Sequence, residues 1–256
     1  MTGRRTAAIG AVSVLVAIGV WYLATERLEL VSPLALPSPV AVADRLVALH
    51  DTAYLGETIW GHTLASIQVM FAGWLLAGVV GVPLGVAMAW STPVRRLVYP
   101  TFQLLRSISP IAWIPLAIIW LGIASSARIF IVFIAAVVPW VVSSMDGVTG
   151  VNPLLIKAAR TLGAGRRTMT DVVLPASLPS LLAGARIAMG NAWTAIIAAE
   201  LLAATAGLGF VALNSSRTLD TPTLLAAMAV IGLLGMLLSY ALQWLSAVLA
   251  PWARKA

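Results

Sequence analysis

The sequence contains no cysteine and only two histidines, and its charged residues make up only 10% of the chain. Without cysteine, neither disulfide bonds nor cysteine-ligated metals can form. The two histidines, His50 and His62, do not have the spacing of a metal site. The G-x-x-x-x-G-K-[ST] loop that holds nucleotide phosphates is absent, as are paired catalytic carboxylates and a nucleophile–base–acid set. We therefore predict that this chain is not an enzyme.

Apolar residues fill the sequence instead. They make up 61% of the chain, and the mean hydropathy is +0.98, whereas a soluble domain is about half apolar and about one quarter charged. They fall in runs of about 20 residues, the length that spans a bilayer. We predict an all-α membrane protein with about six transmembrane helices. The predicted spans are 7–24, 63–90, 98–122, 127–147, 178–203 and 223–250.

Two of these spans have special features. Pro110 and Pro115 should break or bend the third span. The second carries small residues four apart, which let helices approach closely. This stripe is either intrachain packing or part of a two-fold interface or pathway. Its members are Gly73, Ala77, Gly81 and Gly85. Before these spans, residues 39–51 are predicted to form a helix at the membrane interface, with Val40, Ala43, Leu46 and Val47 on one face.

The net charge of +7 comes from cations that lie between the apolar runs. They form no basic face interleaved with aromatics, so we predict no nucleic-acid binding. With the N-terminus in the cytoplasm, ten cations fall inside and four outside, as the positive-inside rule requires. Both termini are therefore predicted to be cytoplasmic. The ten are Arg4, Arg5, Arg95, Arg96, Lys157, Arg160, Arg166, Arg167, Arg254 and Lys255.

The loop between spans four and five, residues 152–175, contains residues that begin and end helices. A loop that only marked the cytoplasmic side would need its cations but not these residues. Asn152 can cap a helix whose first residue is Pro153. Residues 154–162 contain no helix breaker, and Gly163 and Gly165 should end the helix. A second short segment, 166–173, should stop before Pro175. We expect two short helices joined by a glycine elbow, outside the membrane.

The stretch "KAARTLGAGRRTMTDVVLPASLP" resembles the EAA loop of ABC-transporter permeases of the binding-protein-dependent import type. Ala158, Ala159, Gly163, Leu174 and Pro175 match the family motif. Lys157 stands where the family usually has an acidic residue, and the interval from Gly163 to Pro175 is shorter than in the family pattern. These departures leave open a salt bridge from position 157 and the register of the second short helix.

Two further segments resemble the nitrate/sulfonate/taurine branch of these permeases: "LLRSISPIAWIPLAIIWLGI" (104–123) and "GARIAMGNAWTAIIAAELLAATAGLGF" (184–210). The resemblance covers roughly residues 60–250. It implies a fold like that of a type I ABC importer in the bacterial cytoplasmic (inner) membrane. The expected parts are an N-terminal transmembrane helix and external segment (1–60), a permease domain (61–250) and a cytoplasmic tail (251–256).

The resemblance also implies a mechanism and partners. The chain would form the pathway for a small solute, an anion such as nitrate, taurine or an alkanesulfonate. Its loop would be a coupling helix that docks on cytoplasmic ATPase subunits, which alone carry ATP and Mg. The other expected partners are an extracytoplasmic substrate-binding protein, membrane lipid and a second copy of this permease or a homologous one. The residues implied in coupling are Lys157, Ala158, Ala159, Arg160, Gly163, Leu174 and Pro175.

Charged residues inside spans are costly, so each is a candidate site. Arg106 and Glu200 could face the pathway, and Trp113 could contact substrate. The alternatives are a snorkelling arginine, a structural ion pair for Glu200 and simple packing for Trp113. Arg186 is interpreted as an anchor near the cytoplasmic end of span five.

Two other functions remain open from the sequence. An ATP-independent secondary transporter or channel should show ion-coupling carboxylates or an internal repeat, and Glu200 is the only clear carboxylate within a span. A membrane scaffold for a partner enzyme would explain a docking loop but not a broken third span.

Overall fold

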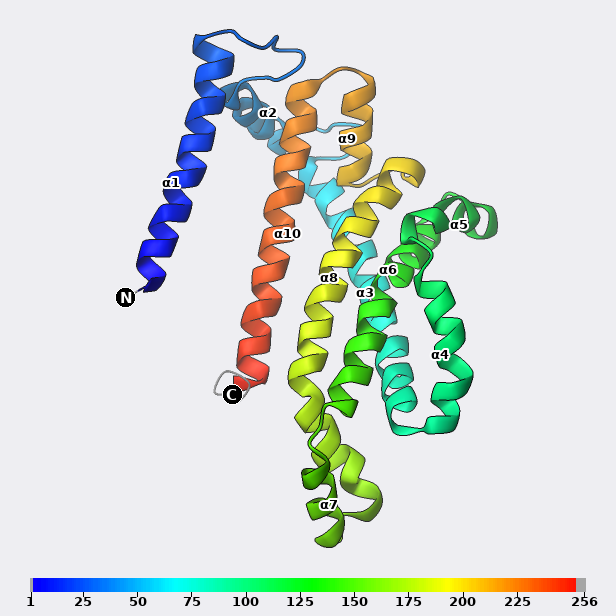
Figure 1. Cartoon of the computed structure of the whole chain (residues 1–256). Coiled ribbons are helices and arrows are strands. Elements are labelled where there is room, and N and C mark those ends of the chain that lie inside the picture. Colours follow the sequence, from blue (N-terminus) through cyan, green and yellow to red (C-terminus); the bar gives the residue numbers. More distant parts are fainter. Residues whose placement is uncertain (1, 252–256) are drawn as a thin grey trace. The chain divides into compact units, whose positions relative to one another are not determined.

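The computed structural model describes residues 2–251, without the side chains of residues 2–8, 11, 166 and 203. Its regular structure is helical, apart from one isolated bridge between Tyr54 and Glu57. The chain forms two compact units, one of residues 1–64 with 206–231 and one of residues 65–205 with 232–256 (Figure 1). The main helices are α1 (Thr2–Tyr22), α2 (Pro39–Asp51), α3 (Ile59–Trp90), α4 (Thr92–Arg106), α5 (Ile114–Leu121), α6 (Ser125–Thr149), α7 (Pro153–Thr161), α8 (Leu174–Ala203), α9 (Leu208–Arg217) and α10 (Thr221–Leu249).

Among the described residues, four helices are long and apolar enough to cross a membrane. They are Ile59–Trp90, Ser125–Thr149, Met169–Leu202 and Thr221–Leu249, and the bent pair formed by α4 and the segment Pro110–Leu121 could count as a fifth. α1 occupies the first predicted span and is 21 residues long, close to the length that a span needs. The prediction of an all-α membrane protein is confirmed.

The third span departs from the prediction of one helix over 98–122. α4 ends at Arg106, and the chain resumes as a helix at Pro110 after a bend of 88°. Pro110 opens a 3₁₀ turn, and Pro115 lies in the first turn of α5. A proline is tolerated there because its missing N–H would have had no helical partner. The prolines break the span as expected, but they divide it into two differently directed helices.

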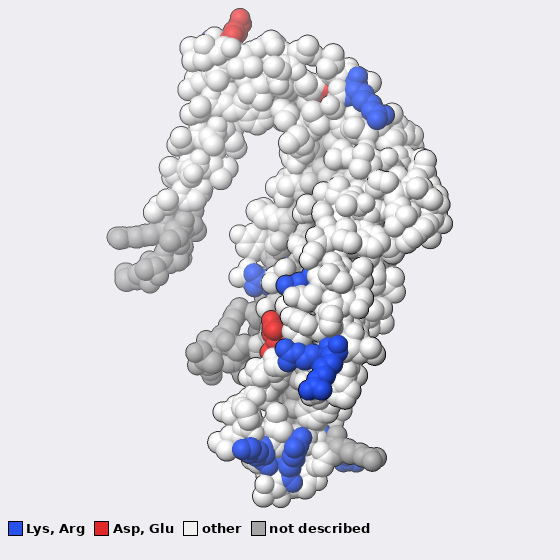
Figure 2. Space-filling model, turned by 45° about the vertical axis from the view of Figure 1, so that its right-hand side comes forward, with Lys and Arg blue, Asp and Glu red and all other residues white. Residues whose placement is uncertain are grey.

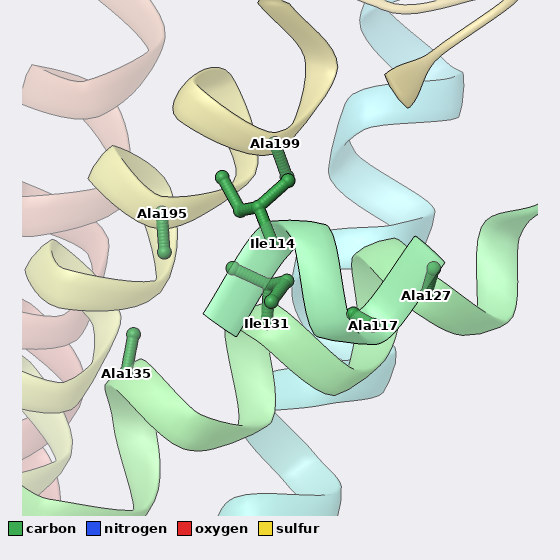
Figure 3. Packing of buried hydrophobic residues seen from close by; sticks show 7 residues of the cluster. All are labelled: Ile114, Ala117, Ala127, Ile131, Ala135, Ala195 and Ala199. Atoms are coloured by element: carbon green, nitrogen blue, oxygen red, sulfur yellow. The ribbon is translucent and has the colours of Figure 1, made fainter. Parts of the chain in front are cut away.

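Alanines hold the short α5 against its neighbours. Figure 3 shows Ile114 of α5 pointing toward Ala199 of α8, with Ile131 of α6 beside it. Small side chains at such contacts let helix backbones approach closely. The buried cluster consists of Ile114, Ala117, Ala127, Ile131, Ala135, Ala195 and Ala199.

The stripe of small residues on α3 packs against α6. A Cβ built at Gly73 would lie 2.6 Å from the side chain of Val132, and one at Gly85 would lie 2.7 Å from Cβ of Ser144. Ala77, between them, is fully buried. The interpretation as intrachain packing is confirmed, and the alternative of a two-fold interface or pathway is wrong for this face.

α6 and α8 meet along an interface of glycine and serine, which the sequence patterns did not single out. A Cβ at Gly147 of α6 would lie 3.0 Å from Cβ of Ser180. A Cβ at Gly184 of α8 would lie 2.6 Å from Oγ of Ser143. The Ser180 hydroxyl donates to the Ser143 carbonyl at 3.0 Å. The two helices are therefore in near backbone contact at the end closest to α7 (Figure 1).

In the other unit, α2 packs with one face and leaves another uncovered. Ser38 caps the helix by accepting from the Ala41 N–H. Val42 and Leu49 are buried, whereas Val40 and Val47 are exposed. The face predicted to meet the membrane interface thus remains free, and its interfacial position stays a prediction.

Polar contacts tie the segments of this unit together. Arg45 of α2 pairs with Asp220 at 3.3 Å and also donates to Thr223. His62 is buried; its Nε2 lies 2.8 Å from the Tyr54 carbonyl oxygen, and its Nδ1 accepts from the Gly207 N–H. Because Nδ1 accepts, the Nε2 nitrogen carries the proton. His62 therefore has a structural role.

We predict that Gly184→Val destabilises the protein, since its new methyl groups meet Ser143 across the tight α6–α8 interface. Overpacking of this kind costs about 1–3 kcal/mol. Thermal unfolding of the detergent-purified protein measures the change. Gly190→Ala in the same helix is the matched control, since nothing lies within 4 Å of its new Cβ. Equal unfolding temperatures for the two variants would contradict the close approach of α6 and α8.

Candidate functional site

The first candidate site is the short helix α7. The Asn152 side chain accepts from the Leu154 N–H at 2.9 Å, and Pro153 is the first helical residue. The helix ends at Thr161, and Gly163 follows with φ of +88°, in the left-handed region that glycine tolerates. The predicted beginning and end of this helix are confirmed.

One side of α7 is anchored to the membrane helices by a small apolar core. Ile156 of α7 packs against a cluster formed by Val148 at the end of α6, Val151 just after α6 and Val173 just before α8. All three valines are buried. α7 is thus attached to both helices that flank its loop.

The opposite side of α7 is an uncovered apolar ridge. Leu154, Leu155 and Leu162 are 69%, 52% and 88% exposed, and Ala158 is exposed between them. Residues four apart lie in one row on a helix, so Leu154, Ala158 and Leu162 line up. Contiguous exposed apolar side chains of this kind mark interaction sites.

The residues implied in coupling fall into several groups. Lys157 and Arg160 are exposed, Ala158 is part of the ridge, and Ala159 is half-buried. Leu174 and Pro175 are not part of the ridge, because they belong to α8. The three leucines were not among the coupling residues predicted from the sequence. Their placement on one face of a short helix beside cations was the available signal.

The second predicted short helix does not exist as a separate element, which corrects the prediction that residues 166–173 stop before Pro175. A 3₁₀ turn at Gly165–Arg167 leads into a π-helical turn at Met169–Val173, which continues directly into α8. The Leu174 N–H donates to the Met169 carbonyl, five residues back. This wider turn accommodates Pro175, which lies in the first turn of α8 and needs no N–H partner there.

Cations gather around this loop. Figure 2 shows blue side chains in the lower part of the view, where α7 lies in Figure 1. The exposed ones of this unit include Lys157, Arg160 and Arg167, with Arg95 and Arg96 at the beginning of α4. The side chains of Arg4, Arg5 and Arg166, and the residues Arg254 and Lys255, lie outside the described part of the chain.

Two cavities of about 290 Å³ each open beside α8, and both have polar side chains in their walls. The first lies at the break in the third span and is lined by Ser109, Pro110, Ile111, Ala135, Asn191, Thr194 and Ala195. The second lies between α8 and α10 and is lined by Ala183, Arg186, Ile187 and Ser239. The sequence predicted the break in the third span but neither of these cavities.

The three predicted pathway residues lie elsewhere. Arg106 is exposed in the last turn of α4. Trp113 packs beside the alanine cluster and meets Phe130 edge to face at 6.3 Å. Glu200 is 1% exposed and accepts from the Ser66 hydroxyl at 2.7 Å. None of the three lines either cavity, so their roles in a pathway stay predictions.

Known proteins are similar to this chain in sequence and in fold. The family described as "Binding-protein-dependent transport system inner membrane component" matches residues 81–255. The chain is 37% identical to the taurine transport system permease protein of Escherichia coli, over 98% of this chain and 91% of that protein. It is 32% identical to the putative aliphatic sulfonates transport permease protein of E. coli, over 92% of this chain and 88% of that protein.

A more distant relative and a solved structure extend the comparison. The bicarbonate transport system permease protein of Synechococcus elongatus is 32% identical over 76% of this chain and 71% of that protein. A chain of the inward-facing MetNI methionine ABC transporter has a TM-score of 0.65 and covers 73% of this chain and 93% of that one. At 19% identity, this likeness concerns the fold alone.

Membership in this family means a membrane subunit that is not an enzyme, with ATP hydrolysis on a separate subunit. Members of the family function together with an ATPase and a substrate-binding protein, and they are multi-pass proteins of the inner membrane. The capped loop helix, the helical membrane core and the matched relatives lead to one conclusion: this chain belongs to the inner-membrane permease components of binding-protein-dependent ABC importers.

Proposed function

We propose that this permease carries a small anion into the cell. Three relatives are named for taurine, aliphatic sulfonates and bicarbonate, and each of these solutes bears an anionic sulfonate or carboxylate-like group. Among the described residues, the cation Arg186 is the only charged residue that lines either of the two cavities beside α8. A pathway with a cation in its wall favours an anion.

The ridge of α7 is the proposed docking surface for the ATPase. Leu154, Ala158 and Leu162 would enter an apolar groove on that subunit, while Lys157 would meet its rim. A buried apolar core with a polar rim is the usual anatomy of an interface. Because Lys157 is exposed and cationic, the facing groove should be neutral or acidic at that point.

Closure of the ATPase would then move α6 and α8 together. Ile156 fixes α7 to the ends of both helices, and the Gly147 and Gly184 contacts hold α6 and α8 in near backbone contact. Packed helices move as units because their interfaces have no slack. A displacement of the ridge would therefore reach the cavities beside α8, opening them alternately to each side of the membrane.

We propose that ATP and Mg bind only to the partner ATPase, since the chain has no phosphate-binding loop. A second copy of this permease would complete the pathway, and an extracytoplasmic binding protein would deliver the anion. The cytoplasmic side would be the one that carries α7, because the exposed arginines of α4 lie at the same end. Both termini would then be cytoplasmic.

Copurification and transport test this function together. The chain is coexpressed with a candidate ATPase and binding protein, purified and placed in vesicles. ATP-driven uptake of taurine, an alkanesulfonate, bicarbonate or nitrate is the expected result. Uptake by the chain alone, driven by an ion gradient, would instead establish the alternative of a secondary transporter or channel.

Leu162→Asp should remove the ATPase from the purified complex, because a carboxylate in an apolar groove must be desolvated at a cost of several kcal/mol. The retained ATPase per permease, measured after affinity purification, should fall at least about tenfold. Asn152→Asp is the matched control. It adds the same charge to the same helix but keeps the N-cap. Normal ATPase retention by Leu162→Asp would show that the ridge is not part of the interface with the ATPase.

Gly163 provides a second test of the coupling loop, because its importance should lie in its backbone rather than in the space around it. No atom lies within 4 Å of a Cβ built there, but φ is +88°. Gly163→Val should abolish ATP-driven uptake while the protein still inserts in the membrane. Gly163→Asn should retain much of the uptake, since asparagine tolerates left-handed φ best among the other residues. Unimpaired uptake by Gly163→Val would show that coupling does not require the left-handed backbone at this position.

A further inference from the structure

One face of α8 is left uncovered along the middle of the helix. Its residues recur every three or four positions, as one side of a helix requires. The opposite side is buried, through residues such as Ala188, Ala192 and Ala199. We call this uncovered side the open face of α8. It consists of Ala183, Ile187, Gly190, Asn191 and Thr194, all of which are exposed.

The open face is polar where a lipid-facing surface should be apolar. Asn191 lies near the midpoint of α8, and no hydrogen bond from the described residues reaches its carboxamide. Thr194 satisfies its hydroxyl within the helix by donating to the Gly190 carbonyl. An unpaired amide in hydrocarbon is costly, so such residues face a bundle interior or a water-filled space.

The first cavity lies directly beside this amide. It is formed where the third span is broken, and Ser109 from the break lines it together with Asn191. The amide supplies two N–H donors, and the serine hydroxyl supplies one more. The small side chains of Ala135 and Ala195 also line the cavity. These neutral donors can bind the oxygens of an anion without trapping it as a full ion pair would.

In the sequence, Gly190 lies between Ile187, which lines the second cavity, and Asn191, which lines the first. A Cβ built at Gly190 meets nothing within 4 Å, so the glycine borders open space rather than a close helix contact. Arg186 lies one turn further along, in the wall of the second cavity with Ser239. Arg186 and Asn191 are five positions apart, which corresponds to about 7.5 Å along the helix axis.

We propose that the open face of α8 lines the transport route and that the two cavities are successive binding sites for a small oxyanion. The first site holds the anion by hydrogen bonds from Asn191 and Ser109, and the second by the charge of Arg186 with the Ser239 hydroxyl. This inference rests on the proposed transport function and adds the residues that select an anion. It assigns Arg186 a role beyond membrane anchoring.

The absence of native cysteine makes the route directly testable. Single cysteines are introduced at Ile187, Gly190, Asn191 or Thr194 in the full importer complex in vesicles. They are treated with a membrane-impermeant anionic methanethiosulfonate, and separately with its cationic counterpart. The matched control is Val79→Cys on α3, which is 72% exposed and apolar.

We expect the open-face cysteines to react at least about tenfold faster than Val79→Cys, since thiolates form in water and not in lipid. Arg186→Gln should lower the ratio of anionic to cationic reaction rates at Asn191→Cys about tenfold, while Arg186→Lys preserves it. Reaction no faster than at Val79→Cys would place the face against lipid and overturn the proposal. A ratio unchanged by Arg186→Gln would overturn the second site.

A bulky substitution tests whether the substrate passes along the open face, independently of the reactivity of introduced cysteines. Gly190→Trp fits the open space and should reduce ATP-driven uptake at least about tenfold, with the ATPase still bound; Val79→Trp should leave uptake unchanged. Normal uptake by Gly190→Trp would overturn the route. The wild-type complex is assayed alongside: if it shows no ATP-driven uptake, the proposed function fails, whereas uptake by wild type with unreactive face cysteines defeats only this inference.

Discussion

The close approach of α6 and α8 is the contact on which the rest of this membrane core depends. Gly147 and Gly184 leave no room for a side chain, and the Ser180 hydroxyl joins the two helices directly. In a bilayer, where apolar side chains gain little from leaving lipid, such backbone contact is a main source of helix association. It also makes the loop between the helices mechanically useful, because α7 sits at the end of a pair that cannot slide apart.

The same principle of small contacts explains why a broken third span is stable. α5 is only one short helix, turned by 88° from α4, and it has little surface with which to hold its place. Alanines on three helices bring it close to α6 and α8. The break can therefore expose Ser109 to a cavity without loosening the core. Irregular backbone at membrane depth is tolerated in such protected places.

Patterns that act within one helix were readable from the sequence. The Asn152 cap, the Gly163 end and the prolines of the third span follow from local backbone chemistry, and the structure has them. What lay beyond prediction depends on several helices at once. The partner of a small-residue stripe, the burial of Glu200 beside Ser66 and the cavity beside Asn191 each require knowledge of which faces meet. The prediction that the short helix stops before Pro175 was wrong for a local reason, because a π turn accommodates this proline.

That π turn has a geometric consequence for the whole chain. Residues Met169–Leu202 form one continuous helix, so the number of residues between Gly163 and Pro175 sets the azimuth of α8 relative to the ridge of α7. Each inserted or deleted residue rotates everything beyond it by about 100°, unless a wider turn absorbs it. Loop length in this permease is therefore an angular setting, which decides whether Asn191 points into the cavity or away from it.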